Sequence, residues 1–177
     1  MNLNNRIDLV SDIGKFLSNY LDVNFDNSKD SNQTAFEKVI KQGQMNNPWF
    51  TDENIKTNLT YWAEILNKEY LLQWMSNYDT KNVSKKNIAI IMAGNIPLVG
   101  FHDFLCVFLA GHKSIIKLSS NDKHILPFLT SLLISKNISI ADDIVYLDGM
   151  LTNYDGVIAT GSNNTSRYFD YYFKNKK

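Results

Sequence analysis

Three short polar turns in the second half of the chain contain residue types that can hold a negative charge or a ribose. Residues 94–97, Gly-Asn-Ile-Pro, include Asn95, whose side-chain amide is a donor suited to an oxyanion. Residues 117–121, Lys-Leu-Ser-Ser-Asn, supply a cation and two hydroxyls, which suit a ribose or a phosphate. Residues 159–163, Ala-Thr-Gly-Ser-Asn, precede a predicted helix whose free N–H groups attract an anion such as pyrophosphate.

Each turn also has an ordinary structural interpretation. Asn95 can simply cap the helix that follows it, and Lys117 can be a solvated lysine before a Ser or Asn cap. Their shared position favours a binding site, because each turn follows a predicted strand and ligands bind outside the carboxyl ends of the strands in such sheets. The sequence therefore favours a dinucleotide site, although it contains neither a G-x-G-x-x-G fingerprint nor a P-loop.

A thiol-based site is the competing chemistry. Cys106 lies four residues after His102, which places both on one face of a predicted helix and within reach of each other. The apolar neighbours of Cys106 favour a different interpretation, that of a small buried side chain that resists ionisation. The histidines and Cys106 match no zinc spacing, so no metal site is expected.

The elements that must position these turns fall into two regions. Residues 1–84 show helical patterning, with amphipathic helices expected within 7–21 and 35–40. A third helix is expected to begin after Thr51, which serves as its N-cap ahead of acidic residues in the first turn. Apolar residues spaced by three or four then predict one continuous helical face as far as Trp74.

Residues 85–177 alternate short β-branched runs with helical stretches, which predicts an α/β fold. The continuous apolar run at 88–92 is typical of a parallel strand that is covered on both faces. The other predicted strands are 114–118, 143–147 and 156–159, and the predicted helices are 98–110, 122–135 and 163–173. We expect a parallel, doubly wound sheet, because crossovers between parallel strands need helices of about this length.

Composition narrows the class of protein. The 177 residues carry 18 basic and 18 acidic side chains, so no basic excess supports binding to nucleic acid. No apolar stretch approaches the ~20 residues that a membrane-spanning helix needs, and the N-terminal segment lacks the apolar core of a secretory signal. The single cysteine excludes an intramolecular disulfide. A cytoplasmic protein with no nucleic-acid partner and no membrane span is therefore expected.

Three motifs in this order resemble a known family. Residues 90–100, 109–120 and 158–167 are similar to the first half of an aldehyde-dehydrogenase-type nucleotide-binding domain, and more narrowly to the LuxC-type acyl-CoA reductases. The resemblance covers about residues 85–173, and the helical leader fits with less specific motifs. It implies a partial Rossmann-like domain, reduction of a fatty acyl-CoA or acyl-protein thioester to an aldehyde, and NADPH (or NADH) as cofactor. A homo-oligomer is compatible with it.

The resemblance also implies roles for individual residues. Asn95 corresponds to the asparagine of an Asn-x-Pro turn that stabilises the oxyanion of the thiohemiacetal, and the remaining matched residues are assigned to cofactor binding. Lys117 and Ser119 correspond to residues that hold the adenosine ribose. Ser120 replaces a glutamate there, which removes the acceptor for the ribose hydroxyls and relaxes the exclusion of the 2′-phosphate of NADPH. The full set of predicted cofactor residues is Ile96, Lys117, Ser119, Ser120, Thr160, Gly161 and Ser162.

The resemblance further implies that the nucleophile lies elsewhere. In this family the nucleophilic cysteine follows the Thr-Gly-Ser turn, in a separate catalytic domain, and Cys106 precedes that turn. The expectation is an N-terminal fragment with a helical region at 1–84, a partial NAD(P)-binding domain at 85–177 and no catalytic domain. The alternative is a catalytically silent nucleotide-binding or partner-binding module.

Overall fold

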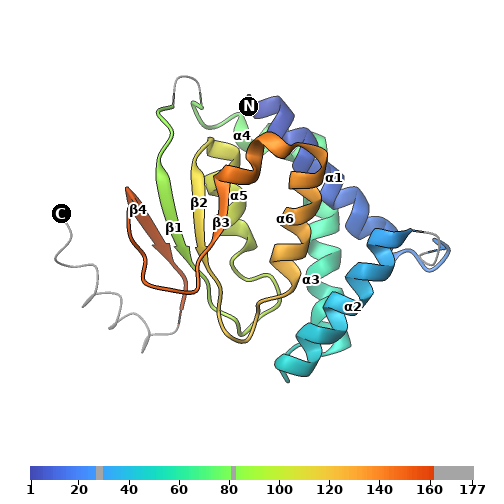
Figure 1. Cartoon of the computed structure of the whole chain (residues 1–177). Helices are drawn as coiled ribbons and strands as arrows, with labels where there is room; N and C mark the ends of the chain where they lie inside the picture. Colours follow the sequence, from blue (N-terminus) through green and yellow to red (C-terminus); the bar gives the residue numbers. More distant parts are fainter. Residues whose placement is uncertain (27–29, 81–82, 162–177) are drawn as a thin grey trace.

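The computed structural model describes residues 1–26, 30–80 and 83–161, which fold into three layers. The helices before the sheet are α1 (Leu3–Leu21), α2 (Ser31–Asn46), α3 (Asp52–Ile65) and α4 (Lys68–Met75). The elements that follow are β1 (Asn87–Ile91), α5 (Phe101–Ala110), β2 (Lys113–Lys117), α6 (Ile125–Lys136), the 3₁₀ helix η2 (Ile138–Asp143), β3 (Ile144–Tyr146) and β4 (Gly156–Ala159). Figure 1 shows their arrangement.

The four described strands form one parallel sheet in the order β3-β2-β1-β4. At its centre Ile90 of β1 pairs with Ile116 of β2 on one side and with Ile158 of β4 on the other. The chain runs outward from β1 through β2 to β3 and then returns to place β4 on the other side of β1. The direction in which strands are added therefore reverses at β1. Such a reversal opens a crevice at the carboxyl ends of the strands. The predicted α/β fold with a parallel sheet is confirmed.

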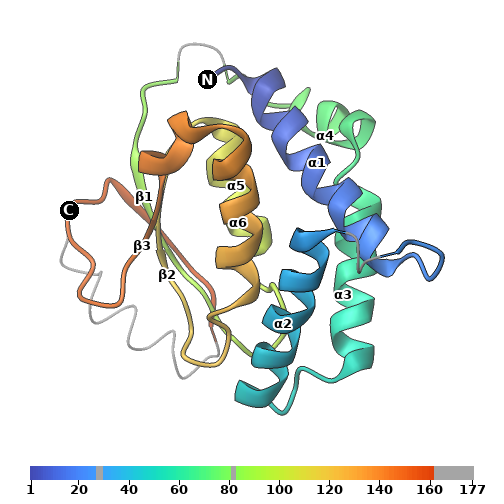
Figure 2. The ribbon, with the colours of Figure 1, turned by 45° about the vertical axis from the view of Figure 1, so that its right-hand side comes forward.

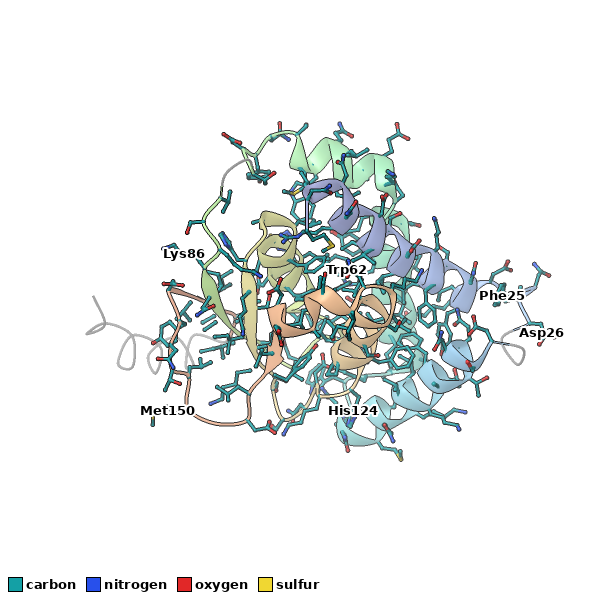
Figure 3. All side chains as sticks on the ribbon, turned by 45° about the horizontal axis from the view of Figure 1, so that its top comes forward. Phe25, Asp26, Trp62, Lys86, His124 and Met150 are labelled. Carbon is teal, nitrogen blue, oxygen red and sulfur yellow. The ribbon has the colours of Figure 1, made fainter. Side chains whose placement is uncertain are left out.

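Helices α5 and α6 form the middle layer, between the sheet and the N-terminal helices (Figure 2). One apolar core runs through all three layers, from Leu59 of α3 to Phe104 of α5 and Ile90 of the sheet, all with completely buried side chains. Burial of each such side chain contributes roughly 1.5–3 kcal/mol to stability. Figure 3 shows Trp62 of α3 within this packed interior, where its ring meets Phe101 edge-on at 4.8 Å.

A buried arginine joins the first helix to the middle layer. Arg6 of α1 donates from Nη1 to the carbonyl oxygen of Phe108, at 3.0 Å, in the last turn of α5. A cation is favourable at a helix C-terminus, where unpaired carbonyls carry partial negative charge. Gly111 follows with φ 95° and ends α5 with a left-handed cap, a conformation that glycine adopts without strain.

The third helix differs from the prediction. It is not continuous to Trp74, because the Asn67 side chain accepts a hydrogen bond from the Tyr70 amide at 2.8 Å and caps a new helix, α4. The buried face shifts as a result, so that Leu71 and Met75 are buried while Tyr70 is exposed. An asparagine that bonds its own backbone interrupts a helix in this way. The Thr51 cap of α3 is confirmed.

The two crossover helices begin later than predicted. Helix α5 starts at Phe101 rather than at 98, because Leu98 has a left-handed backbone with φ 58°, which a helix cannot contain. Helix α6 starts at Ile125, since the Asp122 carboxylate accepts a hydrogen bond from the Leu98 amide instead of sitting in a helical turn. The α2 helix is longer than predicted, and the predicted helix 163–173 lies outside the described residues.

No helix in the described ranges combines the length and the apolar character that crossing a bilayer requires.

Candidate functional site

A cleft of about 640 Å³ opens at the carboxyl ends of β1, β2 and β4. It is lined by residues 91–95, from the last residue of β1 onward, by 117–119 and Asn121, from the last residue of β2 onward, and by Thr160 and Gly161 after β4. Cofactor and small-molecule sites typically measure about 300–1,000 Å³. The three turns singled out in the sequence therefore meet in one cavity of suitable size.

The predicted site residues fall into three groups. Asn95, Lys117, Ser119, Thr160 and Gly161 line the cleft. Of the others, Ile96 and Ser120 are exposed on the same two loops without contributing to the cleft lining, and Ser162 lies outside the described residues. The alternative role of Asn95 as a helix cap is wrong, because Gly100 occupies the cap position of α5 and the Asn95 side chain is exposed.

The loops after β1 and β2 approach each other closely at Gly94. A Cβ atom built on Gly94 would lie 2.6 Å from the Ser119 Cβ and would also meet the Ser119 hydroxyl oxygen. Real Cβ atoms do not come this close, so any side chain at position 94 forces the two loops apart. Glycine is therefore required for the approach that shapes this part of the cleft.

A buried asparagine from the helical region holds these two loops together. Asn47 follows α2, and its Nδ2 donates to the Gly94 carbonyl oxygen at 2.7 Å and to the Asn121 carbonyl oxygen at 3.4 Å. Its Oδ1 accepts from the Trp49 amide at 3.0 Å. The side chain is almost completely buried. Sequence reasoning missed Asn47 because an asparagine before a proline reads as an ordinary turn residue.

The cleft's other contributions from outside the three turns are Trp49 and Val99. Trp49 comes from the same turn as Asn47, while Val99 lies in the turn before α5. Sequence reasoning also missed Trp49, because a single tryptophan in a predicted turn is a weak signal and no apolar periodicity marks it as a site residue.

A second buried group shapes the loop that carries Asn95. The Asp122 carboxylate accepts a hydrogen bond from the Leu98 amide at 3.3 Å. Leu98 is the residue with the left-handed backbone, so this bond stabilises a turn that a leucine rarely adopts. Burial raises the pKa of Asp122 to about 6, and the Leu98 hydrogen bond opposes that rise.

The electrostatics of the cleft favour an anion. Among the described residues that line it, Lys117 is the one with a charged side chain. Its ammonium group donates to the Gly149 carbonyl oxygen at 3.1 Å, which leaves two further N–H donors. At the carboxyl end of β4 the Thr160 hydroxyl donates to Asp103 at 2.7 Å, which fixes the start of the third turn against α5.

The Cys106 and His102 pair does not form part of this cleft. The Cys106 sulfur lies 3.8 Å from Nδ1 of His102, while the imidazole stacks on Trp74 at 5.6 Å between ring centroids. Burial, together with the negative charge of Asp103, raises the pKa of the Cys106 thiol, so the nucleophilic thiolate is disfavoured. Within the described part of the chain, no group of three His, Cys, Asp or Glu side chains is placed to hold a metal ion.

Comparison with known proteins gives evidence on the family to which the chain belongs. The family model described as acyl-CoA reductase (LuxC) matches residues 1–176. This match includes the helical region, where the sequence motifs were less specific, as well as the three turns. No curated protein and no solved structure matches the chain. The family implies acyl-CoA reduction with an acyl thioester substrate and a nicotinamide cofactor. Because the match covers nearly every residue, the chain belongs to the LuxC family of acyl-CoA reductases.

Proposed function

We propose that this chain forms the NADPH cleft of a fatty acyl-CoA reductase and contributes one oxyanion donor to it. The observation that carries the proposal is the meeting of three predicted turns, each at the end of a parallel strand, in one cleft with Lys117 as its charged residue. Family membership supports the reaction class, and the size and lining of the cleft support its assignment to the dinucleotide.

The residues present fit such a cofactor. Gly94 lets the loop after β1 pack directly against Ser119, and the Ser119 hydroxyl and Lys117 ammonium groups in the same cleft lining match a ribose and a phosphate. We assign Lys117 and Ser119 to the adenosine ribose and its 2′-phosphate, with Ser120 at the rim. Thr160, Gly161 and Ser162 are assigned to the pyrophosphate. The reduced nicotinamide, when bound, supplies a hydride.

The described lining supports a preference for NADPH over NADH. A carboxylate that accepts from both ribose hydroxyls is the usual means of selecting NADH, and it would repel a 2′-phosphate. The described lining contains no carboxylate, and Asp122, which lies on the same loop, is buried against the Leu98 amide. Lys117 adds a positive charge at the same strand end.

Asn95 is the proposed catalytic contribution of this chain. Its side chain lies exposed in the cleft lining, on a loop held by Asn47 and by Asp122. An amide donor fixed before the reaction begins stabilises negative charge that develops on a thioester oxygen without reorganising at that moment. Ile96 follows on the same loop and is proposed to border the cofactor.

The acyl-accepting thiol is proposed to come from outside these 177 residues. Cys106 is the one cysteine of the sequence, burial raises the pKa of its thiol, and it does not line the cleft. We therefore propose an N-terminal helical region, 1–84, and a partial dinucleotide domain, 85–177, that act together with a separate catalytic domain. This observation equally favours the second candidate, a nucleotide-binding module without catalytic activity of its own.

The test is a calorimetric titration of NADPH and NADH against the purified chain. We expect NADPH to bind more tightly than NADH, and Lys117→Ala to weaken NADPH binding by roughly tenfold or more, the value of a charge-assisted contact. Lys113→Ala is the matched control, because Lys113 stands at the opposite end of the same strand. Absence of NADPH binding at millimolar concentration, or an equal loss in both variants, would refute the proposal.

The same preparation separates the two candidate functions. NADPH oxidation that depends on acyl-CoA is not expected from this chain alone, and addition of a cysteine-bearing catalytic domain should restore it if the fragment interpretation holds. A chain that binds NADPH and stays inactive with that domain supports the silent module.

A further inference from the structure

The turn between α2 and α3 places an exposed tryptophan at the cleft. Trp49 is 69% exposed, yet it is one of the cleft-lining residues. Most large aromatic rings are largely buried in folded proteins, so an indole that lies open inside a concave site is unusual. Within residues 1–26, 30–80 and 83–161, the other strongly exposed aromatic residues are Tyr61, Tyr70 and Tyr78, and none of them lines this cleft.

The backbone that carries Trp49 is fixed on both sides. Its amide donates to Oδ1 of Asn47 at 3.0 Å, and its carbonyl oxygen accepts from Nδ2 of Asn54 at 2.8 Å. The next residue, Phe50, is almost fully buried and donates its amide to the Asn47 carbonyl oxygen at 3.0 Å. The turn is thus ordered before any ligand binds, which lowers the entropy cost of a contact made by the indole.

The same turn is attached to the loops that form the proposed dinucleotide site. Asn47 bonds to the loop after β1 at Gly94 and to the loop after β2 at Asn121. Its neighbour Asn46 lies 2.6 Å from the imidazole of His124, which Figure 3 shows at the start of α6. The backbone at Trp49 is therefore joined to the loops that carry Ser119 and Asn95.

We propose that the Trp49 indole stacks on one of the two base rings of the bound dinucleotide, the adenine or the nicotinamide. The proposal rests on the proposed function, and it adds a recognition residue from the helical region to a site otherwise built at the strand ends. The adenine is heteroaromatic, and the dihydronicotinamide ring of NADPH, although no longer aromatic, keeps a nearly flat conjugated face, so an indole can pack against either ring. The helical region thereby becomes one wall of the cofactor site rather than a separate support.

The test compares Trp49→Ala and Trp49→Phe with the wild-type chain by calorimetry, using NADPH, 2′,5′-ADP and reduced nicotinamide mononucleotide. Removal of a stacking ring is expected to weaken NADPH binding by about 5- to 150-fold, whereas phenylalanine retains most of the affinity. The half-molecule that loses affinity to the same extent identifies the stacked base. Tyr78→Ala is the control, because Tyr78 is similarly exposed and lies away from the cleft.

The possible results distinguish a failure of the Trp49 stacking proposal from a failure of the proposed NADPH site. Wild-type binding of NADPH that Trp49→Ala retains in full overturns the role of Trp49 and leaves the cleft assignment standing. Absence of wild-type binding overturns both. If Trp49→Ala keeps its affinity for NADPH but changes its oligomeric state, the stacking role of Trp49 is also overturned, and Trp49 instead forms a contact between subunits. Equal melting temperatures of the variants confirm that folding is not the cause of a loss.

Discussion

Replacement of Asn47 by alanine tests whether the helical region holds the cleft together. The change removes the donor to the Gly94 and Asn121 carbonyl oxygens and the acceptor for the Trp49 amide. The Gly94 acceptor lies in a buried position, and an orphaned buried polar group costs about 1–3 kcal/mol, while each of the other two bonds contributes about 0.5–1.5 kcal/mol. We therefore expect a loss of roughly 3 kcal/mol in the free energy of unfolding.

The loss is measured by urea denaturation and by thermal melting. For a chain of this length, 3 kcal/mol corresponds to a fall of roughly 6–12 °C in Tm. Asn47→Asp keeps the side-chain volume but turns a carboxylate oxygen towards two carbonyl oxygens, so it should destabilise at least as much. Asn46→Ala is the matched control, since Asn46 is the exposed neighbour and makes one contact, to His124. It should cost less than about 1 kcal/mol.

Two results would refute a structural role of Asn47: a free energy of unfolding of Asn47→Ala within about 1 kcal/mol of the wild type, or equal losses of stability in Asn47→Ala and Asn46→Ala. Either result would mean that the buried bonds of Asn47 are not what joins the α2–α3 turn to the strand-end loops.

Two further predictions concern the loops themselves. Gly94→Ala should separate the loops, because the added Cβ meets Ser119, and it should weaken NADPH binding and lower stability by about 1–3 kcal/mol. Gly149→Ala, whose added Cβ meets nothing within 4 Å, should leave calorimetry and melting unchanged; an equal effect of both would contradict the steric argument. Burial raises the pKa of Asp122 from 3.8 to about 6, so the folded state binds this proton more tightly than the unfolded state does. The free energy of unfolding should therefore fall by roughly 3 kcal/mol as the pH rises from about 4 through 6. The Asp122→Asn side chain can still accept a hydrogen bond from the Leu98 amide but carries no titratable proton, so the substitution should remove this pH-dependent loss. The variant should therefore be more stable than the wild type at pH 7.5 but not at pH 4, as measured by denaturation curves at both pH values. An equal gain in stability at both pH values would count against this explanation.

The strands were the most predictable part of the fold. The runs at 88–92, 114–118 and 156–159 match β1, β2 and β4 to within one residue, because a strand in a parallel sheet must be apolar on both faces. The same rule places the turns after them at a shared edge. Five of the predicted site residues consequently line one cleft.

The helix boundaries were less predictable for a local and a tertiary reason. The break at Asn67 depends on a side chain that bonds its own backbone, a choice that a periodic apolar pattern conceals. The late starts of α5 and α6 depend on the bond between Asp122 and the Leu98 amide, which joins two separate loops. No sequence pattern within either loop predicts a hydrogen bond to a residue of the other loop.

By itself the sequence determined the order of the elements, the parallel sheet and the turns that carry the candidate chemistry, since each follows from the residues of one short segment. Tertiary structure alone decided that Asn47 and Trp49, which precede the sheet, form part of the same cleft. The physical reason is that a buried amide gains its partners only when distant segments pack together. Its role is a property of the packed loops, and an asparagine before a proline carries no sign of it.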